Sequence, residues 1–159
     1  MKKNRFYRVL AVILTLTLFF SVLGYADANA AVITKQAKQV AKIVNKERTK
    51  RNKGKLTLDK KLTKLANKRA KECAKLFSHT RPNGEDCFSI LKENGVTYMT
   101  CGENIAAGQL TAKQVMNSWM HSAGHKKNIL TKGFHKIGVG YYKKSGSSYK
   151  YYWVQIFTD

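Results

Sequence analysis

The spacing of apolar residues changes from helical to strand-like near Lys136, and this change limits the fold more than any other feature of the sequence. Before it, apolar side chains recur about every three or four positions, as in helices that are buried on one side. After it, two runs rich in β-branched and aromatic residues, 137–142 and 149–157, flank a loop-forming segment at 143–148. This pattern predicts a C-terminal β-hairpin. Helices first and a hairpin last, without alternating strands and helices, indicate an α+β domain.

Two helices are expected in the first part of the domain. The first covers residues 33–44, where apolar positions alternate with lysine and glutamine at helical spacing. The second starts in the segment 56–59, with Thr57 or Asp59 as its N-cap, and extends to about Phe77. Cys73 falls on the apolar face of this second helix, so we expect it to be a small core residue.

Two further helices are expected before the hairpin. A short one covers residues 86–93 and ends at Gly95, and Thr111 caps the other, which Gly124 interrupts. Trp119 shares the apolar face of the latter helix, so we expect it to be buried. The segment 96–105 between these helices is expected to be loop or strand.

Two glycines in the first hairpin strand bear on how the layers pack. Gly138 and Gly140 are two positions apart, so both lie on the same face of the strand. That face carries no side chains at these positions, which suits close packing of a helix.

The N-terminus has the pattern of an export signal. Residues 2–8 contain four basic side chains, residues 9–23 are almost entirely apolar, and Ala28-Asn29-Ala30 is a small-residue cleavage site. We therefore interpret residues 1–30 as a signal peptide and residues 31–159 as the mature domain, either secreted or associated with the cell wall. The alternative is an uncleaved anchor, but the apolar run is short for a membrane span. No transmembrane segment is expected after cleavage.

The charge of the chain indicates affinity for polyanions. Removal of residues 1–30 would leave 26 basic and 8 acidic side chains, a net charge of +18. Export argues against nucleic acid as the partner. Anionic cell-wall polymers, glycans or lipids are the partners we expect, unless the lysines serve only to keep the protein soluble.

Three cysteines remain in the mature chain, so at least one must be unpaired within it. Cys87 and Cys101 could form a disulfide, but the sequence does not give the distance between them.

Three polar segments are the candidates for a functional site: Ser78–Gly84 with His79, Gly102–Ala106 with Glu103, and Trp119–His125 with His125. Two neutral imidazoles could bind a divalent metal such as zinc, and a nearby glutamate could accept a proton from bound water. The alternative is a hydrogen-bonded network that ties loops together. No closely spaced pair of ligands, as in HExxH, distinguishes the two.

The order of these segments is informative. His79-Thr80-Arg81-Pro82-Asn83-Gly84, Gly102-Glu103-Asn104-Ile105-Ala106, Trp119…Ser122…Gly124-His125…Asn128-Ile129-Leu130 and Ile137-Gly138-Val139-Gly140 follow one another along the chain. Together they resemble the bacterial branch of the CAP superfamily, also called the SCP or cysteine-rich secretory, antigen 5 and pathogenesis-related-1 domain. The resemblance covers about residues 32–157. It implies an α-β-α sandwich that the C-terminal hairpin completes.

The resemblance also implies a cleft of two histidines and two acidic residues, which in some members holds a divalent metal. His79, Glu103 and His125 match three of these positions. The chain departs from the pattern at the fourth, where Ser122 replaces a glutamate. Ser122 is a weak ligand and not a base. Neighbouring His121 could substitute for the missing group, or it could be a solvent-facing helix residue.

Three functions remain open from the sequence. The first is an exported CAP domain that binds a ligand through its cleft; whether it catalyses any reaction is left open. The second is a metal-assisted, protease-like hydrolase with His79 and His125 as ligands and Glu103 as the catalytic base. The third is a cysteine–histidine hydrolase that uses Cys101, which would need an exposed thiol with a lowered pKa.

Overall fold

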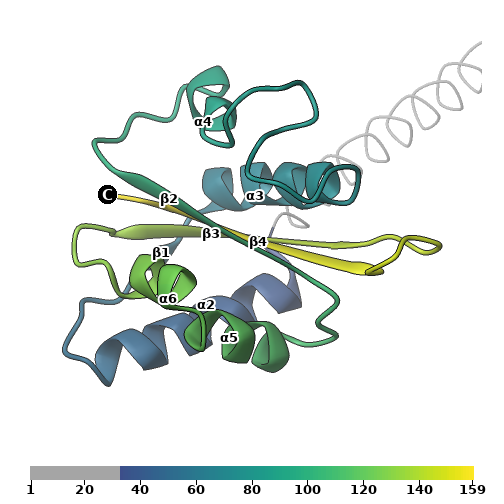
Figure 1. Cartoon of the computed structure of the whole chain (residues 1–159). Coiled ribbons are helices and arrows are strands. Elements are labelled where there is room, and N and C mark those ends of the chain that lie inside the picture. Colours follow the sequence, from purple (N-terminus) through teal and green to yellow (C-terminus); the bar gives the residue numbers. More distant parts are fainter. Residues whose placement is uncertain (1–32) are drawn as a thin grey trace, which may run out of the picture. The chain divides into compact units, whose positions relative to one another are not determined.

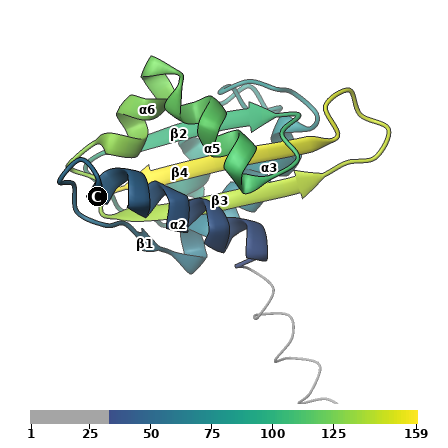
Figure 2. The same ribbon diagram turned by 90° about the horizontal axis from the view of Figure 1, so that it is seen from below.

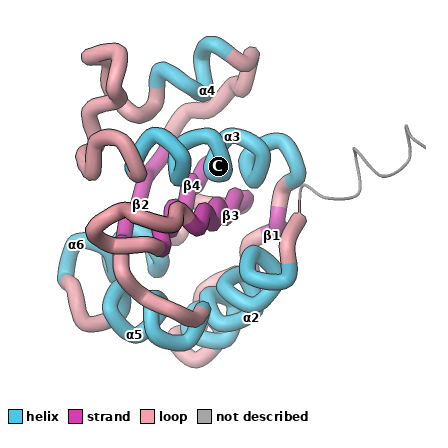
Figure 3. Tube along the Cα trace, turned by 90° about the vertical axis from the view of Figure 1, so that its right-hand side faces the viewer, coloured by secondary structure: helices cyan, strands magenta, loops and turns pink. Residues whose placement is uncertain are grey.

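The computed structural model describes residues 33–159, which form three layers with a sheet in the middle (Figures 1 and 3). The elements are, in chain order, α2 (Lys35–Thr49), β1 (Thr57–Leu58), α3 (Lys60–Cys73), α4 (Ser89–Glu93), β2 (Cys101–Ala107), α5 (Ala112–Met120), α6 (Ala123–Leu130), β3 (Lys136–Lys143) and β4 (Tyr151–Thr158). The expected signal peptide lies outside the described residues. Among residues 33–159, no helix is long and apolar enough to cross a membrane.

The four strands lie in the order β1-β3-β4-β2. β3 and β4 are antiparallel over their full length, from Lys136 opposite Thr158 to Lys143 opposite Tyr151, which confirms the predicted hairpin. β2, within the segment expected to be loop or strand, pairs antiparallel with β4. It is therefore an edge strand, and groups from both faces of the sheet can reach it.

Each face of the sheet is covered by its own set of helices. α3 and α4 lie on one face, and α2, α5 and α6 lie on the other (Figures 1 and 2). Two separate hydrophobic clusters correspond to these two interfaces. The α-β-α sandwich expected for the chain is thereby confirmed.

The contact between α3 and β3 depends on the two glycines of β3. A Cβ atom added to Gly138 would lie 2.2 Å from the carbonyl carbon of Leu62, and one added to Gly140 would lie 2.1 Å from the carbonyl oxygen of Ala66. No side chain fits at such distances, so the helix backbone packs directly on the strand. The close packing predicted from these glycines is confirmed.

Trp119 and Cys73 occupy the core positions expected of them. Trp119 is fully buried between α5 and the sheet, and its indole Nε1 donates to the carbonyl oxygen of Ile105 at 3.3 Å. This bond links α5 to β2. Cys73 is buried in the cluster beneath α3.

Of the two N-caps predicted for the second helix, Asp59 is confirmed, because its carboxylate accepts from the backbone N–H of Leu62 at 2.7 Å. Thr57 and Leu58 form the short strand β1, parallel to β3, and the helix begins only after Asp59. The backbone N–H of Thr57 donates to His135 and that of Asp59 donates to Ile137, both at 2.9 Å. Pairing with β3 satisfies these groups, so the extended form is preferred over a longer helix. The helix also ends at Cys73, not near residue 77.

Two other helix boundaries were predicted wrongly. α4 begins at Ser89, because the carboxylate of Asp86 accepts from the N–H of Phe88 at 2.8 Å and forms a turn before the helix. The break between α5 and α6 falls at Ser122, which has extended backbone angles (φ −102°, ψ 123°), while Gly124 lies within α6.

Replacement of Gly138 by alanine should separate α3 from the sheet. Because the added methyl group would meet helix backbone, which cannot rotate away, we expect Gly138→Ala to lower the free energy of unfolding by about 1–3 kcal/mol or more. Gly54→Ala is the matched control, since a Cβ there meets no atom within 4 Å. Denaturant unfolding measures both variants; equal stability would contradict the packing described.

Candidate functional site

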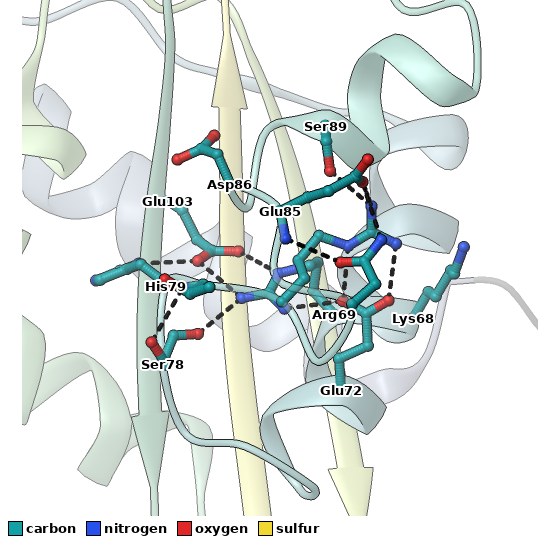
Figure 4. Close-up of polar contacts among 12 residues, drawn as sticks. Lys68, Arg69, Glu72, Ser78, His79, Glu85, Asp86, Ser89 and Glu103 are labelled. Carbon is teal, nitrogen blue, oxygen red and sulfur yellow. Dashed lines mark hydrogen bonds and ion pairs between the residues drawn. The ribbon is translucent and has the colours of Figure 1, made fainter.

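The site is built on a buried ion pair between Glu103 of β2 and Arg69 of α3 (Figure 4). The Arg69 Nε atom donates to Glu103 Oε2 at 2.8 Å, and Nη2 donates to Oε1 at 3.2 Å. The Arg69 side chain is 0% exposed and that of Glu103 is 2% exposed. Two parallel bonds of this kind fix the carboxylate in one orientation.

His79 is the third member of this arrangement. Its Nδ1 atom lies 2.9 Å from Glu103 Oε1, and because an ionised carboxylate only accepts, Nδ1 carries the hydrogen. The loop that carries His79 is held by Arg69 Nη2, which also donates to the carbonyl oxygen of Ser78 at 3.0 Å. The His79 side chain is 56% exposed, so its other ring nitrogen, Nε2, is the atom available for a ligand.

The carboxylate of Glu103 and the cationic groups that bond to it stabilise each other's charged forms. Burial alone would raise the pKa of Glu103, but the hydrogen bonds from His79 and Arg69 outweigh it and keep that pKa below its ordinary value. Glu103 is therefore ionised at neutral pH. Its hydrogen bond in turn raises the pKa of His79, against a smaller opposing effect of burial.

A second arginine extends the network away from β2. Glu72 accepts from Arg69 Nη1 at 2.8 Å and from Arg81 Nη2 at 3.0 Å, so it joins the two guanidinium groups. Arg81 also donates to three side chains of the following segment, Glu85, Ser89 and Glu93. The long connection between α3 and β2 is thus held in place beside His79.

The residue after Glu103 positions the other histidine. Asn104 donates through Nδ2 to the carbonyl oxygen of His125 at 3.1 Å and to Gln155 Oε1 at 2.9 Å. Asn128 of α6 donates to the Asn104 side chain at 2.9 Å and to the backbone oxygen of Glu103 at 3.1 Å. These bonds join α6 to the edge of the sheet. Glu103 and Asn104 are neighbours on β2, so their side chains lie on opposite faces of the sheet. Glu103 contacts His79 on one face, and Asn104 contacts the backbone of His125 on the other.

His125 is half-buried in α6 and is close enough to His79 to respond to its charge. Burial lowers the pKa of His125, and a positive charge on His79 lowers it further. The neutral imidazole is therefore favoured at His125. The structure thus brings His79 and Glu103 into direct contact, with His125 nearby and electrostatically coupled to them.

Cys87 is a site residue that the sequence did not indicate. A nitrogen of His79, the thiol of Cys87 and an oxygen of Glu103 lie within 4.8 Å of one another, a spacing that could hold a metal ion. Burial raises the pKa of the Cys87 thiol, so it stays protonated in the absence of a cation. Cys73, Cys87 and Cys101 are free in the described part of the chain. Burial raises the pKa of Cys101 also, the opposite of what a nucleophile requires.

Among residues 33–159, neither Ser122 nor His121 forms a hydrogen bond with His79 or Glu103. Ser122 is the N-cap of α6, and its side chain forms no capping hydrogen bond. His121 ends α5, is exposed, and its Nδ1 lies 2.8 Å from the carbonyl oxygen of Asn117. It lines an open groove of about 910 Å³ between α2 and α5, together with Ile43 and Met120. This groove does not contain His79 or Glu103.

Arg69 is the principal residue that sequence reasoning missed. It lies on the apolar stripe of α3, between Ala66 and Ala70, both of which are fully buried. A charged residue at a core-facing helical position must have a partner, because an unpaired buried charge is strongly unfavourable. This position was the available signal that Arg69 has a buried acidic partner.

The contact between His79 and Glu103 has a feature that is common in metal sites. A histidine whose Nδ1–H donates to a carboxylate, with Nε2 directed outward, is the arrangement usual for metal ligands. His79 and Glu103 have this relation, and His125 contributes a second imidazole that favours the neutral form. Both oxygens of Glu103 are already hydrogen-bonded, so Glu103 suits the role of an orienting anion better than that of a ligand.

Comparison with known proteins agrees with the fold and the motifs. The family model described as "CAP: Cysteine-rich secretory protein family" matches residues 41–157. The uncharacterized protein YkwD of Bacillus subtilis (strain 168) is 40% identical over 122 residues, which cover 76% of this chain and 46% of YkwD.

Solved structures give the same result. An extracellular protein of Bacillus anthracis that contains an SCP domain is 28% identical, with a TM-score of 0.70 over 77% of this chain and 40% of that protein. An outer surface protein of Borrelia burgdorferi, 22% identical, shares the fold with a TM-score of 0.71 over 80% of this chain and 94% of its own. The chain thus spans less than half the length of YkwD and of the Bacillus anthracis protein.

The two histidines should titrate in opposite directions from the ordinary histidine pKa of about 6.5. NMR of the imidazole signals should give a midpoint above this value for His79 and below it for His125. Glu103→Gln should lower the His79 midpoint, because the anion that stabilises the imidazolium is removed. His79→Ala should raise the His125 midpoint, because a nearby positive charge is removed.

The control for this titration is His121→Ala, which removes an exposed histidine at the C-terminal end of α5. It should leave the midpoints of His79 and His125 unchanged. A His79 midpoint that does not respond to Glu103→Gln would contradict the hydrogen bond between these residues.

Proposed function

Since the chain belongs to the CAP family of cysteine-rich secretory proteins, we propose that it is exported and binds a ligand outside the cell through a site formed by His79, Glu103 and His125. Relatives of similar fold are an extracellular protein and an outer surface protein, which supports this location. The basic signal-like N-terminus of the sequence supports it also.

The state of Glu103 is the observation that carries the proposal. A general base needs a free oxygen and a pKa near the working pH. The pKa of Glu103 is lowered instead, and Arg69 and His79 hydrogen-bond to its two oxygens. Such a carboxylate holds an imidazole in position and accepts protons poorly, so binding is favoured over the metal-assisted hydrolysis that would use Glu103 as base.

We include a divalent cation such as zinc among the ligands of this site. His79 Nε2 and the imidazole of His125 would hold it, and Glu103 would fix the ring of His79. The cation would supply a positive centre for an anionic or carbonyl-containing ligand. The absence of a glutamate at position 122 leaves the site with few protein donors, so we expect weak binding.

Calorimetry with Zn²⁺ tests the metal site. His79→Ala and His125→Ala should each abolish measurable binding, and Glu103→Gln should weaken it about 10–100-fold, because the orienting anion is lost. The control variant His121→Ala should bind as the parent does. Binding should also decline as the pH falls, beginning above about pH 6.5, because the raised pKa of His79 makes protonation compete earlier.

A peptidase assay on the Zn²⁺-loaded protein separates binding from hydrolysis. We expect no turnover by the parent protein. Hydrolysis that is lost in Glu103→Gln while Zn²⁺ stays bound would establish the hydrolase instead. Unchanged Zn²⁺ binding by all three site variants would show that the ion binds elsewhere, and the cluster would then be a structural brace.

A further inference from the structure

Four exposed lysines surround a depression beside α2 that shares no residue with the histidine site. The depression has a volume of about 530 Å³ and is lined by residues of α2, by Lys50 at its end and by Lys55 of the segment that leads to β1. It is lined by Lys42, Asn45, Lys46, Thr49, Lys50 and Lys55, which we call the lysine groove. In the part of the chain that the structure describes, no acidic residue lines it.

The wall opposite α2 is fixed by two side chains of the helix itself. Asn45 Nδ2 donates to the carbonyl oxygen of Leu56 at 2.9 Å, and Asn45 Oδ1 accepts from the N–H of Leu56 at 2.8 Å. Buried Arg48 donates through Nε to the carbonyl oxygen of Gly54 at 2.6 Å. The backbone on both sides of Lys55 is therefore held, and the groove has a defined shape before any ligand binds.

The positive charges of the groove are largely uncompensated. Within residues 33–159, Lys42, Lys46 and Lys55 form no ion pair with an acidic side chain, whereas Lys50 lies 3.2 Å from a carboxylate oxygen of Glu47. That carboxylate is shared with Arg51, at 2.6 Å. Crowding of like charges is unfavourable unless an anion is present. The groove is thus suited to several negative charges at once.

The arrangement fits a linear polyanion. Lys42, Lys46 and Lys50 follow one another at four-residue intervals, which places them in a row with a rise of about 6 Å from one to the next. An ammonium group binds phosphate as a point charge, without demanding a fixed geometry. A flexible chain of phosphodiesters can therefore place successive charges along the row.

Two other polyanions fit less well. Single-stranded nucleic acid is held by aromatic side chains on which its bases stack, and no aromatic residue lines the groove among the residues described. A membrane surface is bound by apolar side chains beside the basic ones. The exposed large hydrophobic residues of the described chain lie elsewhere: Leu76, Phe77, Met99, Leu110 and Tyr149.

We propose that the lysine groove binds a linear polyol-phosphate polymer outside the cell and so retains the protein at an anionic cell surface. The proposal rests on the proposed function in one respect, the export of the chain. It concerns a different surface, since none of the groove residues belongs to the histidine site.

Titration with a poly(glycerol phosphate) chain tests the groove. The triple variant Lys42→Gln, Lys46→Gln, Lys55→Gln should bind at least about tenfold more weakly at low salt. The slope of log affinity against log salt should become shallower by about 2, because each phosphate that a lysine neutralises adds about 0.7 to that slope. The matched control is Lys64→Gln, Lys71→Gln, Lys75→Gln, which removes the same charge from exposed positions in and just after α3. Its affinity should fall by less than about threefold.

Equal losses of affinity in the two triple variants would overturn the proposal, because they would mean that the whole surface attracts the polymer. Tighter binding of the groove to anionic lipid vesicles or to a DNA duplex than to the polymer would overturn it in favour of those partners. His79→Ala separates the two sites. It should bind the polymer as the parent does while losing Zn²⁺, and the groove variant should bind Zn²⁺ as the parent does.

Discussion

The ion pair of Arg69 and Glu103 is the interaction on which the site depends. A buried carboxylate is strongly unfavourable unless its charge is paired and its oxygens are hydrogen-bonded. Arg69 provides two bonds and His79 provides a third, so the charge is retained in a position that is 2% exposed. The same guanidinium binds Glu72 and the carbonyl oxygen of Ser78. One side chain thereby joins α3, the loop that carries His79 and the edge of the sheet.

The packing of the layers makes this pairing geometrically feasible. α3 approaches β3 closely enough for backbone contact because Gly138 and Gly140 have no side chains, and this brings Arg69 within reach of β2. On the other face, Asn104 connects the same strand to α6 and so to His125. The two histidines are therefore held by contacts with neighbouring residues of the same edge strand, from different layers. A change in either helix layer would alter their separation.

Much of this could be predicted from the sequence, and the remainder depends on tertiary contacts. Local periodicity and residue size predicted the hairpin, the glycine contact and the burial of Trp119. These patterns involve residues that are close together in the sequence. The strand at Thr57 was missed because its hydrogen-bond partners, His135 and Ile137, lie about eighty positions later in the chain. The contact of Glu103 with Arg69 was missed for a similar reason, since Arg69 is 34 positions away. Its place on an apolar helical stripe was informative, but only in combination with a buried acid elsewhere.

A double-mutant cycle on Arg69 and Glu103 tests this account most directly. Arg69→Gln and Glu103→Gln should each lower the free energy of unfolding by about 3–5 kcal/mol, because each leaves a buried charge without its main partner. The double variant leaves neither charge, so its loss of stability should be smaller than the sum of the single losses by at least about 2 kcal/mol. Additivity within about 0.5 kcal/mol would contradict the account, since it would mean that the two side chains do not depend on each other.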